Sequence, residues 1–573
     1  MRPLQAAERL QRRAGQDQPE GLVCCLRREI VAIRIIGRHP IATATGPQNL
    51  HGYISRYNTT ATRAACIILG SCLAAFIDRA TATASGAALP WTQGDLAISG
   101  DDAPLVAVAY NAAYYCGILI GPFLLMRAGR IRYLALCLAT YAVAALCCAL
   151  SQSFWELIVS RIVLGFAGGG FFLGVLMTSF TNLPPRVSPL FILGYAAVSQ
   201  CASAVAPLLA GSIVNDDSWR ILYVMLGLGA AAAAVLVTVP ASEGSLDTEL
   251  RKENAQKSTD FIGLGLLVAL ISAYAYIMGY GEQRDWLNAD DVAFATRLLA
   301  VVAIAFGGWE RFGARDPIVP LAIFRERDVR LGVILAIAAG FPLYGTSELL
   351  GYLEGALKFP LYLAGGVIAI RAIALLVSAP MGSALVARGV DSRFVMATGF
   401  VMSAAAFAWE SLGITSGSEA STFIGPEFLV GLGFGLTYAP LLLTVVSNVG
   451  AVYIPFAIAL MNFTFVLPGS FADAVLSTLF DHRVSSHWAD LASSVRLARP
   501  AIREAIGQHP SATQHLLAAL VYQQSAVMAF VDVALGCAAV AVIAAPFALL
   551  LRPAKPNAQS TSEPAPAGAE ATP

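Results

Sequence analysis

The stretch "IGPFLLMRAGRIR", residues 120–132, joins two long apolar runs and is the most informative part of the sequence for the fold. Gly129 permits a tight turn there, and Arg127 and Arg130 surround the turn with positive charge. A second stretch of the same design, "MGSALVARGVDSR", occupies residues 381–393. One loop design at corresponding places in two halves of the chain predicts an internal repeat.

The apolar runs beside these loops belong to a pattern that extends from residue 64 to residue 551. Of the 573 residues, 57% are hydrophobic and 13% are charged, whereas a soluble chain carries about 25% charged residues. The mean hydropathy is +0.67. Runs of roughly 18 or more apolar residues recur, so the sequence predicts an all-α polytopic membrane protein. The formal net charge is zero, so nothing points to a nucleic-acid partner.

About fourteen membrane spans are expected from the apolar runs. Their expected limits are 64–88, 104–125, 133–151, 155–180, 188–213, 219–240, 261–280, 292–309, 331–354, 361–385, 394–413, 422–448, 453–479 and 524–551. The loops between them alternate between arginine-bearing stretches and acidic or neutral ones such as "GDLAISGDD" and "NDDS". Because positively charged loops stay in the cytoplasm, we expect both termini to be cytoplasmic. The membrane is expected to be a bacterial inner membrane.

The chain is expected to divide into five parts. They are a cytoplasmic tail over residues 1–62, an N-terminal bundle over 63–240, two linker helices with their loops over 241–330, a C-terminal bundle over 331–551, and a disordered tail over 552–573. The first tail either forms a short amphipathic surface helix or reflects an over-long start of the coding region. A periplasmic insertion with helical periodicity in its middle is expected at residues 481–522. The last tail is too rich in Pro, Ala and Ser to bury a core.

Two further motifs lie inside predicted spans. "SRIVLGFAGGG" places Arg161 in a span and follows it with a glycine face suited to close helix packing. "AVAPLLAG", residues 204–211, is a stripe of small residues interrupted by proline. With "YLEGALKFP" and "QQSAVMAFVDVALG", and with the loop at 120–132, these motifs resemble the major facilitator superfamily, specifically its fourteen-helix drug:proton antiporter branch. The resemblance covers roughly residues 65–551.

The resemblance implies two six-helix bundles plus two extra helices, and a proton-coupled exporter of small amphipathic or cationic compounds. Its partners would be the lipid bilayer, a small-molecule substrate, protons and a possible periplasmic adaptor protein. The gating motif would comprise Arg127, Gly129, Arg130, Arg388 and Gly389, and the antiporter motif Ala206, Pro207, Ala210 and Gly211. Export of a specific metabolite or siderophore, and a non-transporting receptor on the same scaffold, remain alternatives. No catalytic array, cofactor or metal-ligand spacing is found, so we expect no enzyme.

This sequence departs from the branch at several places. The loop motif has Met126 where the branch usually has an acidic residue, so a gating ion pair is expected to be missing. In the first span the usual aspartate position corresponds to Thr81, whereas the aspartate of this chain is Asp78, almost one helical turn earlier. We expect Asp78 to do the same work from a neighbouring part of that face, with Thr81 able to hydrogen-bond it.

Charged residues inside the predicted spans are the candidate transport residues, because an ionisable group at the bilayer centre costs about 2.5–3.5 kcal/mol on insertion scales. Adjacent residues on a helix diverge by about 100°, so Asp78 and Arg79 are not expected to be merely each other's partner. Asp78 is predicted to couple proton movement to transport, and Arg79 to have a structural or gating role.

Further candidates lie in or near the later spans. Glu354 and Arg371 are hypothesised to pair between neighbouring spans, structurally or functionally. Glu348 is expected to line the cavity, and Asp473 to carry a proton. Asp532 is expected to be structural. Glu410 and Glu427 lie near span ends and are expected to be solvated, and the tyrosines at 110, 114 and 115 line a substrate path or simply pack.

Overall fold

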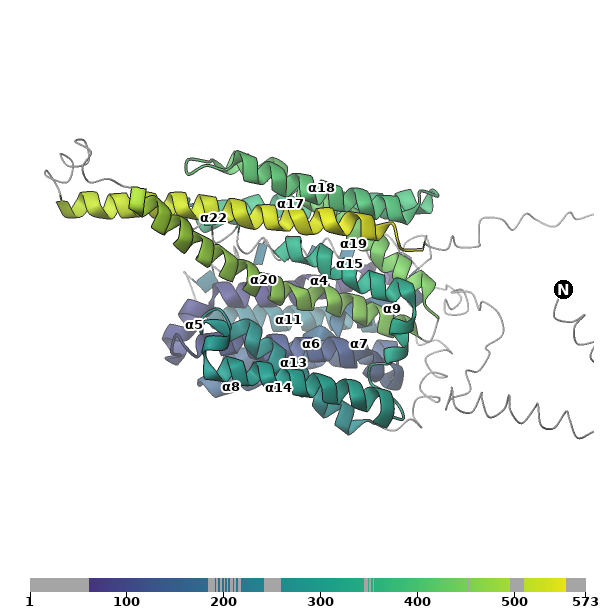
Figure 1. Ribbon diagram of the computed structural model, residues 1–573. Coiled ribbons are helices and arrows are strands. Elements are labelled where there is room, and N and C mark those ends of the chain that lie inside the picture. The colour runs from purple at the N-terminus through teal and green to yellow at the C-terminus, as the bar shows by residue number, and fades with distance from the viewer. Residues whose placement is uncertain are drawn as a thin grey trace, which may run out of the picture. The chain divides into compact units, whose positions relative to one another are not determined.

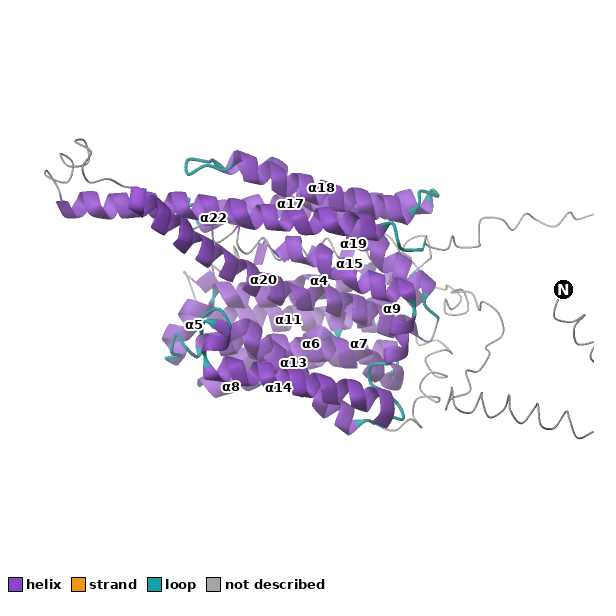
Figure 2. Ribbon diagram, in the orientation of Figure 1, coloured by secondary structure: helices purple, strands orange, loops and turns teal. Residues whose placement is uncertain are grey.

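The structure is a computed structural model that describes residues 61–183, 218–241, 259–344, 355–450, 453–494 and 510–552, with single positions between residues 191 and 214 and between 349 and 353. Figure 2 shows that the regular elements in this described part are helices, without a strand. The two expected tails lie outside it, except at their inner edges. Residues 61 and 62 of the expected N-terminal tail belong to the first described helix.

Among the described residues before position 250 there are six long or medium helices and one short one (Figure 1). They are α4 (Ala61–Ala87), α5 (Leu89–Leu96), α6 (Ala103–Ala128), α7 (Arg130–Leu150), α8 (Phe154–Gly169), α9 (Phe171–Asn182) and α11 (Trp219–Thr238). Polar side chains start several of them. Ser153 caps α8 by accepting a hydrogen bond from the backbone N–H of Glu156, and Ser218 caps α11 in the same way from Arg220.

The later helices begin with the pair α13 and α14. Their bounds, and those of the elements that follow, are α13 (Phe261–Tyr280), α14 (Asp290–Gly308), α15 (Arg327–Tyr344), α17 (Leu361–Ala387), α18 (Ser392–Gly413), α19 (Ala420–Asn448), α20 (Ile454–Ser494) and α22 (Pro510–Ala548). Asp260 caps α13 by accepting from the N–H of Gly263 at 2.8 Å. Asp391 caps α18 by accepting from the N–H of Arg393 at 3.0 Å.

The prediction of an all-helical polytopic membrane protein is confirmed. Among the described residues, 12 helices are long and apolar enough to cross a membrane. They correspond to twelve of the fourteen expected spans. The other two expected spans, 188–213 and 331–354, include residues outside the described part, although α15 covers the first half of the second.

The helices pack in two sets that share contacts through α6, α13 and α20 (Figure 1). In the first set α6 packs on α8, and α11 packs on α4 and α7. In the second set α19 packs on α17 and α18, and α22 packs on α18 and α20. The helices α13 and α14 pack on each other, and α13 also contacts α6 and α20. The pair therefore touches both sets, as extra helices between two bundles would.

Large apolar side chains cover the outer faces of these helices. Leu150 is 76% exposed, Ile304 78% and Leu412 88%. Such exposure is unfavourable in water but suits hydrocarbon, where lipid tails are as apolar as leucine. The outer surface of the described part is therefore a lipid-facing surface.

Both glycines of the repeated loop adopt a backbone conformation that other residues rarely reach. Gly129 has φ of 87° and Gly389 has φ of 94°. Only glycine adopts this region readily, so the tight turns predicted from the two motifs are confirmed. Each turn also follows a helix with an internal proline, Pro122 in α6 and Pro380 in α17.

Two helices are much longer than a membrane span, and Figure 1 shows their far ends running past the other helices. The helix α20 has 41 residues and α22 has 39. Helical structure was expected in the middle of the insertion at 481–522, and residues 495–509 of that middle lie outside the described part. The described edges of the insertion are helical, as continuations of the flanking spans.

Candidate functional site

A buried carboxylate lies in the interior of the first helix set. Asp78, on α4, is 5% exposed, and its Oδ2 accepts a hydrogen bond of 3.1 Å from the hydroxyl of Tyr114 on α6. Its Oδ1 is also buried and has no hydrogen-bond partner among the described residues. A buried oxygen without a partner is costly, so this position favours a protonated carboxyl or a ligand that supplies the missing contact.

Two aromatic rings connect this carboxylate to a buried cation. Tyr114 stacks on Tyr110 with ring centroids 5.8 Å apart. The guanidinium of Arg161, on α8, lies over the Tyr110 ring at 4.6 Å from its centroid. Arg161 is 3% exposed and lies in one of the helices that are long and apolar enough to cross a membrane. Asp78, the two rings and Arg161 form a continuous row, which we call the Asp78 row.

Arg161 is held by neutral oxygen atoms from three other helices. Its Nη1 donates to Ser85 Oγ of α4 at 2.9 Å and to the Tyr223 hydroxyl of α11 at 3.4 Å. Its Nε donates to the carbonyl of Val106 in α6 at 3.3 Å. Arg161 therefore joins α4, α6, α8 and α11, and its position depends on how these helices pack.

The close approach of α6 and α8 depends on glycine, as the sequence motif predicted. A Cβ at Gly165 would lie 2.3 Å from the carbonyl oxygen of Tyr110, and one at Gly169 would lie 2.2 Å from that of Tyr114. Both distances are far below van der Waals contact, so no larger residue fits without moving a helix. These glycines set the distance between α8 and the two tyrosines of the Asp78 row.

The expected role of Thr81 is wrong. Its hydroxyl donates to the carbonyl of Ile77 at 2.7 Å and hydrogen-bonds the hydroxyl of Tyr141 on α7. It is Tyr114, and not Thr81, that holds Asp78. Arg79 is only partly buried, and its guanidinium acts on Asp78 as a neighbouring positive charge.

A second buried charged site lies in the later helix set. Arg371 of α17 is 7% exposed and Glu427 of α19 is 0% exposed. Nε and Nη2 of Arg371 donate to the two carboxylate oxygens of Glu427, each at 2.7 Å. Nη1 of Arg371 donates to the carbonyl of Leu343 at the end of α15, at 3.0 Å. This two-bonded geometry is the strong form of an arginine–carboxylate pair.

This pair bears on two sequence interpretations. The hypothesis that Arg371 pairs with Glu354 stays a prediction, because Glu354 lies outside the described residues. Among the described residues the carboxylate partner of Arg371 is Glu427. Glu427 and Glu410 were both expected to be solvated near span ends. Both are buried, Glu410 at 2% exposure on α18. Distance from a span end was a poor guide, because both residues lie on helix faces that are packed inside the protein.

The two charged sites occupy equivalent places in the internal repeat. Arg161 stands four residues before Gly165, and Glu427 stands four residues before Gly431. A Cβ at Gly431 would lie 2.3 Å from the carbonyl oxygen of Arg371, as one at Gly165 would from that of Tyr110. Arg371 therefore matches Tyr110, and Glu427 matches Arg161. The first half places a cation over an aromatic ring where the second half pairs a carboxylate with a cation.

The other expected transport residues are not brought into either site. Asp473 is exposed on α20 and acts electrostatically on Glu282 of the loop after α13. Asp532 of α22 accepts from Nε2 of His487 on α20 at 2.9 Å, and Arg483 lies 3.5 Å away. This pairing ties the two long helices together. Glu348 lies outside the described residues.

Of the expected antiporter motif, Ala206 and Ala210 are described and fully or nearly fully buried, which agrees with a close-packed stripe. Pro207 and Gly211 lie outside the described residues. In the gating motif, Arg127 packs over the ring of Phe123 at 4.3 Å and donates to Thr259 Oγ1 at 2.7 Å. Arg127 thus bonds the segment just before α13.

In the second gating loop Arg388 is exposed and Gly389 forms the turn. Arg130, in the first loop, is buried at 3% exposure and begins α7. Beside Gly389, Asp391 accepts from the guanidinium of Arg393 at 2.8 Å, and this bond holds the pKa of the Asp391 carboxyl below its usual range. The Asp391 carboxylate therefore stays ionised at neutral pH.

At the opposite ends of the helices, a polar cluster joins α5 to α11. Asp95 Oδ2 accepts from Nε1 of Trp219 at 3.0 Å and from Arg220, and Arg220 also donates to the carbonyl of Ser151 at 3.0 Å. The hydrogen bonds from Arg220 and Trp219 lower the pKa of the Asp95 carboxyl. We call this cluster the Asp95 latch.

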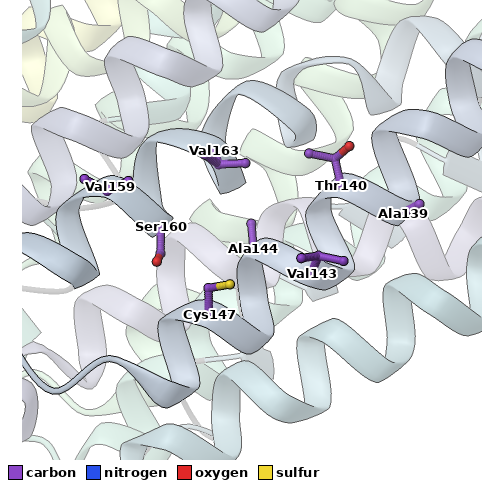
Figure 3. Close-up of a pocket in the computed structure, with 8 residues that line it drawn as sticks. All are labelled: Ala139, Thr140, Val143, Ala144, Cys147, Val159, Ser160 and Val163. Carbon is purple, nitrogen blue, oxygen red and sulfur yellow. The ribbon is translucent and has the colours of Figure 1, made fainter.

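An apolar groove of about 430 Å³ lies between α7 and α8 (Figure 3). Its lining comprises Ala139, Thr140, Val143, Ala144, Cys147, Val159, Ser160 and Val163. Val143 is 61% exposed and Val159 60%, so the groove opens on the lipid-facing surface. It has the size of a ligand site but lacks charged groups, and it is separate from the Asp78 row.

The fold, the internal repeat and the buried charges define a membrane transporter, and comparison with known proteins agrees. Residues 71–472 match the family described as Major Facilitator Superfamily, and the chain belongs to that superfamily. The resemblance seen in the sequence motifs is thereby confirmed.

Among similar proteins is the "Multidrug export protein EmrB" of Escherichia coli strain K12, which is 26% identical over 439 residues, covering 75% of this chain and 82% of that protein. The "Fatty acid resistance protein FarB" of Neisseria gonorrhoeae is 26% identical over 448 residues, covering 75% of this chain and 83% of that one. The crystal structure of the human organic anion transporter MFSD10 (TETRAN) superposes with a TM-score of 0.51 at 11% identity, covering 85% of this chain and 99% of that one. This last likeness concerns the fold alone.

Proposed function

We propose that this chain is a proton-coupled exporter of small amphipathic or cationic compounds, with Asp78 as the coupling carboxylate. Membership of the superfamily supports transport, and the names of the similar export proteins support the multidrug type. The observation that carries the proposal is the Asp78 row, in which a buried carboxylate has one oxygen held by Tyr114 and the other without a partner among the described residues.

The geometry gives Asp78 two alternative states. In the first, a proton on Oδ1 neutralises the carboxyl and removes the cost of a charge in an apolar interior. In the second, the carboxylate is ionised and a cationic or hydrogen-bond-donating substrate supplies the contact that Oδ1 lacks. The two states exclude each other at one atom, and mutual exclusion of proton and substrate is what an antiporter requires.

The Asp78 row also offers a way to connect this exchange to helix movement. Tyr114 donates to Asp78 and stacks on Tyr110, and Tyr110 carries Arg161 on its face. A change of charge at Asp78 alters what Tyr114 bonds, and through the stacked rings it alters the support of Arg161. Because Arg161 bonds α4, α6 and α11, the packing of these helices follows the state of Asp78.

The proposal is tested with Asp78→Asn, which keeps the volume of the side chain and mimics the protonated state. In inverted membrane vesicles with ethidium as the probe, the wild type should move ethidium when a proton gradient is applied. Asp78→Asn should abolish that movement while leaving the amount of folded protein unchanged. The matched control is Asp101→Asn, which removes an exposed carboxylate from the same half of the chain outside the Asp78 row.

Ethidium movement by Asp78→Asn at the wild-type rate, with unchanged dependence on pH, would contradict the proposed role of Asp78. Asp473 would then be the first alternative proton carrier. A set of anionic probes belongs in the same experiment, because one similar protein is named for fatty acid resistance. Transport of a single compound only would favour a specific metabolite or siderophore exporter, and no gradient-dependent movement of any compound would favour a receptor.

The topology and partners complete the proposal. We place both termini in the cytoplasm of a bacterial cell and the extended ends of α20 and α22 in the periplasm, on the alternation of positive loops. A periplasmic adaptor protein would meet the exporter at those extended ends. Arg79 is proposed to gate, and Glu348 to line the cavity.

A further inference from the structure

The later helix set contains a buried carboxyl that the proposed mechanism does not use. Glu410 on α18 is 2% exposed, and its Oε1 is buried with no hydrogen-bond partner among the described residues. Tyr352 interacts electrostatically with Glu410 and is 1% exposed. Its hydroxyl is likewise buried without a hydrogen-bond partner in the described part. Two orphaned polar groups in one interior mark a place that needs either a proton or a ligand.

The charges around Glu410 do not balance. Among the described residues the charged groups that act on Glu410 are Glu427 and Arg371. Arg371 already uses Nε and Nη2 on both oxygens of Glu427 and Nη1 on the carbonyl of Leu343. Two carboxylates beside one guanidinium would leave one net negative charge in a buried interior, which is expensive.

In the described part of the chain, the helices packed on α18 supply no further cation to this place. The main helices in contact with α18 there are α17, α19 and α22. Arg371 comes from α17 and Glu427 from α19. The charged residue described on α22 is Asp532, which already accepts a hydrogen bond from His487 of α20. A second positive charge is therefore not what balances Glu410.

From this geometry we propose that Glu410 is a second proton-binding site of the transporter, set beside the Arg371–Glu427 pair. The carboxylate of Glu410 takes up one proton, which forms a neutral carboxyl and leaves Arg371 to Glu427 alone. When that proton leaves, Arg371 is shared between two carboxylates, and its two bonds to Glu427 weaken. This inference rests on the proposed function, because it gives the proton-coupled cycle a second site in the second half.

The pair explains why the proton belongs to Glu410 and not to Glu427. Both oxygens of Glu427 accept charged hydrogen bonds, which require an ionised carboxylate. Glu410 has the opposite surroundings: an unbonded buried oxygen and a negative neighbour. The tight contact of Gly431 with the carbonyl of Arg371 holds α19 against α17, so the helix backbones that carry Glu427 and Arg371 stay together.

The proposal is tested by labelling the purified full-length chain with dicyclohexylcarbodiimide, an apolar reagent that attacks protonated carboxyl groups in apolar surroundings. Peptide mass spectrometry over a pH series locates the label. We expect label on Glu410 that declines as the pH rises, and none on Glu427. Glu419, an exposed carboxylate at the start of α19, is the matched control and should stay unlabelled.

Two variants sharpen the result. Glu427→Gln frees Arg371 for Glu410, so the label on Glu410 should be lost. Glu410→Gln should lose the label while keeping the folded yield, and it should flatten the pH dependence of ethidium movement. Label on Glu427 in place of Glu410, or undiminished label on Glu410 in Glu427→Gln, would overturn the proposal.

The labelling result decides this inference whether or not ethidium is transported. If the wild type moves no probe under a proton gradient while Glu410 labels as described, the proposed function fails and the proton site stands. If Asp78→Asn abolishes ethidium movement while Glu410 stays unlabelled at every pH, the proposed function stands and the second proton site is refuted.

Discussion

Removal of the Arg371–Glu427 pair should destabilise the later helix set in a strongly non-additive way. We consider Arg371→Met, Glu427→Gln and the double variant. Arg371→Met leaves Glu427 and Glu410 together in a buried place with no cation among the groups described around them. Glu427→Gln leaves Arg371 with Glu410 as a replacement partner. The single changes should therefore differ in size, with Arg371→Met the more damaging.

The magnitude follows from the geometry. Arg371 loses two 2.7 Å bonds to Glu427 and one 3.0 Å bond to Leu343. Removing one partner of a buried ion pair costs about 3–5 kcal/mol, because the other charge stays buried and unpaired. We expect about that loss for Arg371→Met and roughly a third of it for Glu427→Gln. The double variant should be no worse than Arg371→Met, which is a coupling of at least about 1 kcal/mol.

The assay is reversible unfolding of purified protein in mixed micelles, followed by tryptophan fluorescence as the denaturing detergent increases. The control cycle combines Arg371→Met with Glu419→Gln, a change of the same chemical type at an exposed position of α19. That control should be additive to within about 0.5 kcal/mol. Equal effects of the two single changes, or additivity of the Arg371 and Glu427 changes, would refute the reasoning.

Three other outcomes are expected. Gly169→Ala should lower the yield of folded protein and reduce its stability by about 1–3 kcal/mol, because the added Cβ would lie 2.2 Å from the carbonyl oxygen of Tyr114. Gly86→Ala, which has open space around it, should be neutral in the same thermal-shift measurement. Because the pKa of Asp95 is lowered, the stability from the Asp95 latch is present above the usual aspartate pKa and lost only as the pH falls through the lowered value. Asp95→Asn should therefore reduce stability equally from pH about 5 to about 8. A loss confined to the alkaline side would contradict this. A reporter fused after residue 256 should read cytoplasmic and one after residue 505 periplasmic, and the reverse at either site would refute the topology.

Much of the fold could be predicted because the signals are local. Gly129 and Gly389 mark turns that need a positive φ, and the structure has one at each. The glycine face after Arg161 predicted close packing, and the contacts of Gly165 and Gly169 confirm it. The burial of Asp78 also follows from its position in the middle of an apolar run. Each of these features depends on a few neighbouring residues.

The partners of the buried charges could not be predicted, because they come from helices far apart in the sequence. Tyr114 lies 36 residues after Asp78, and Glu427 lies 56 residues after Arg371. Sequence distance to a span end misplaced Glu427 and Glu410, since burial depends on which face of a helix meets its neighbours. One signal in the sequence was available: the spacing from Glu427 to Gly431 equals that from Arg161 to Gly165.

The helix α20 is long enough to turn a small change of tilt into a larger displacement of its far end. Its 41 residues extend about 60 Å at 1.5 Å per residue, twice the thickness of a hydrocarbon core. Within the layer, Ser470 of this helix accepts from the hydroxyl of Tyr115 in α6 at 3.0 Å, so its fulcrum lies at the contact between the two helix sets. A change of tilt of about 10° about that point moves the far end by roughly 6 Å. Small rearrangements around the buried charges are therefore magnified at the far end of α20, and the pairing of Asp532 with His487 couples α22 to the same movement.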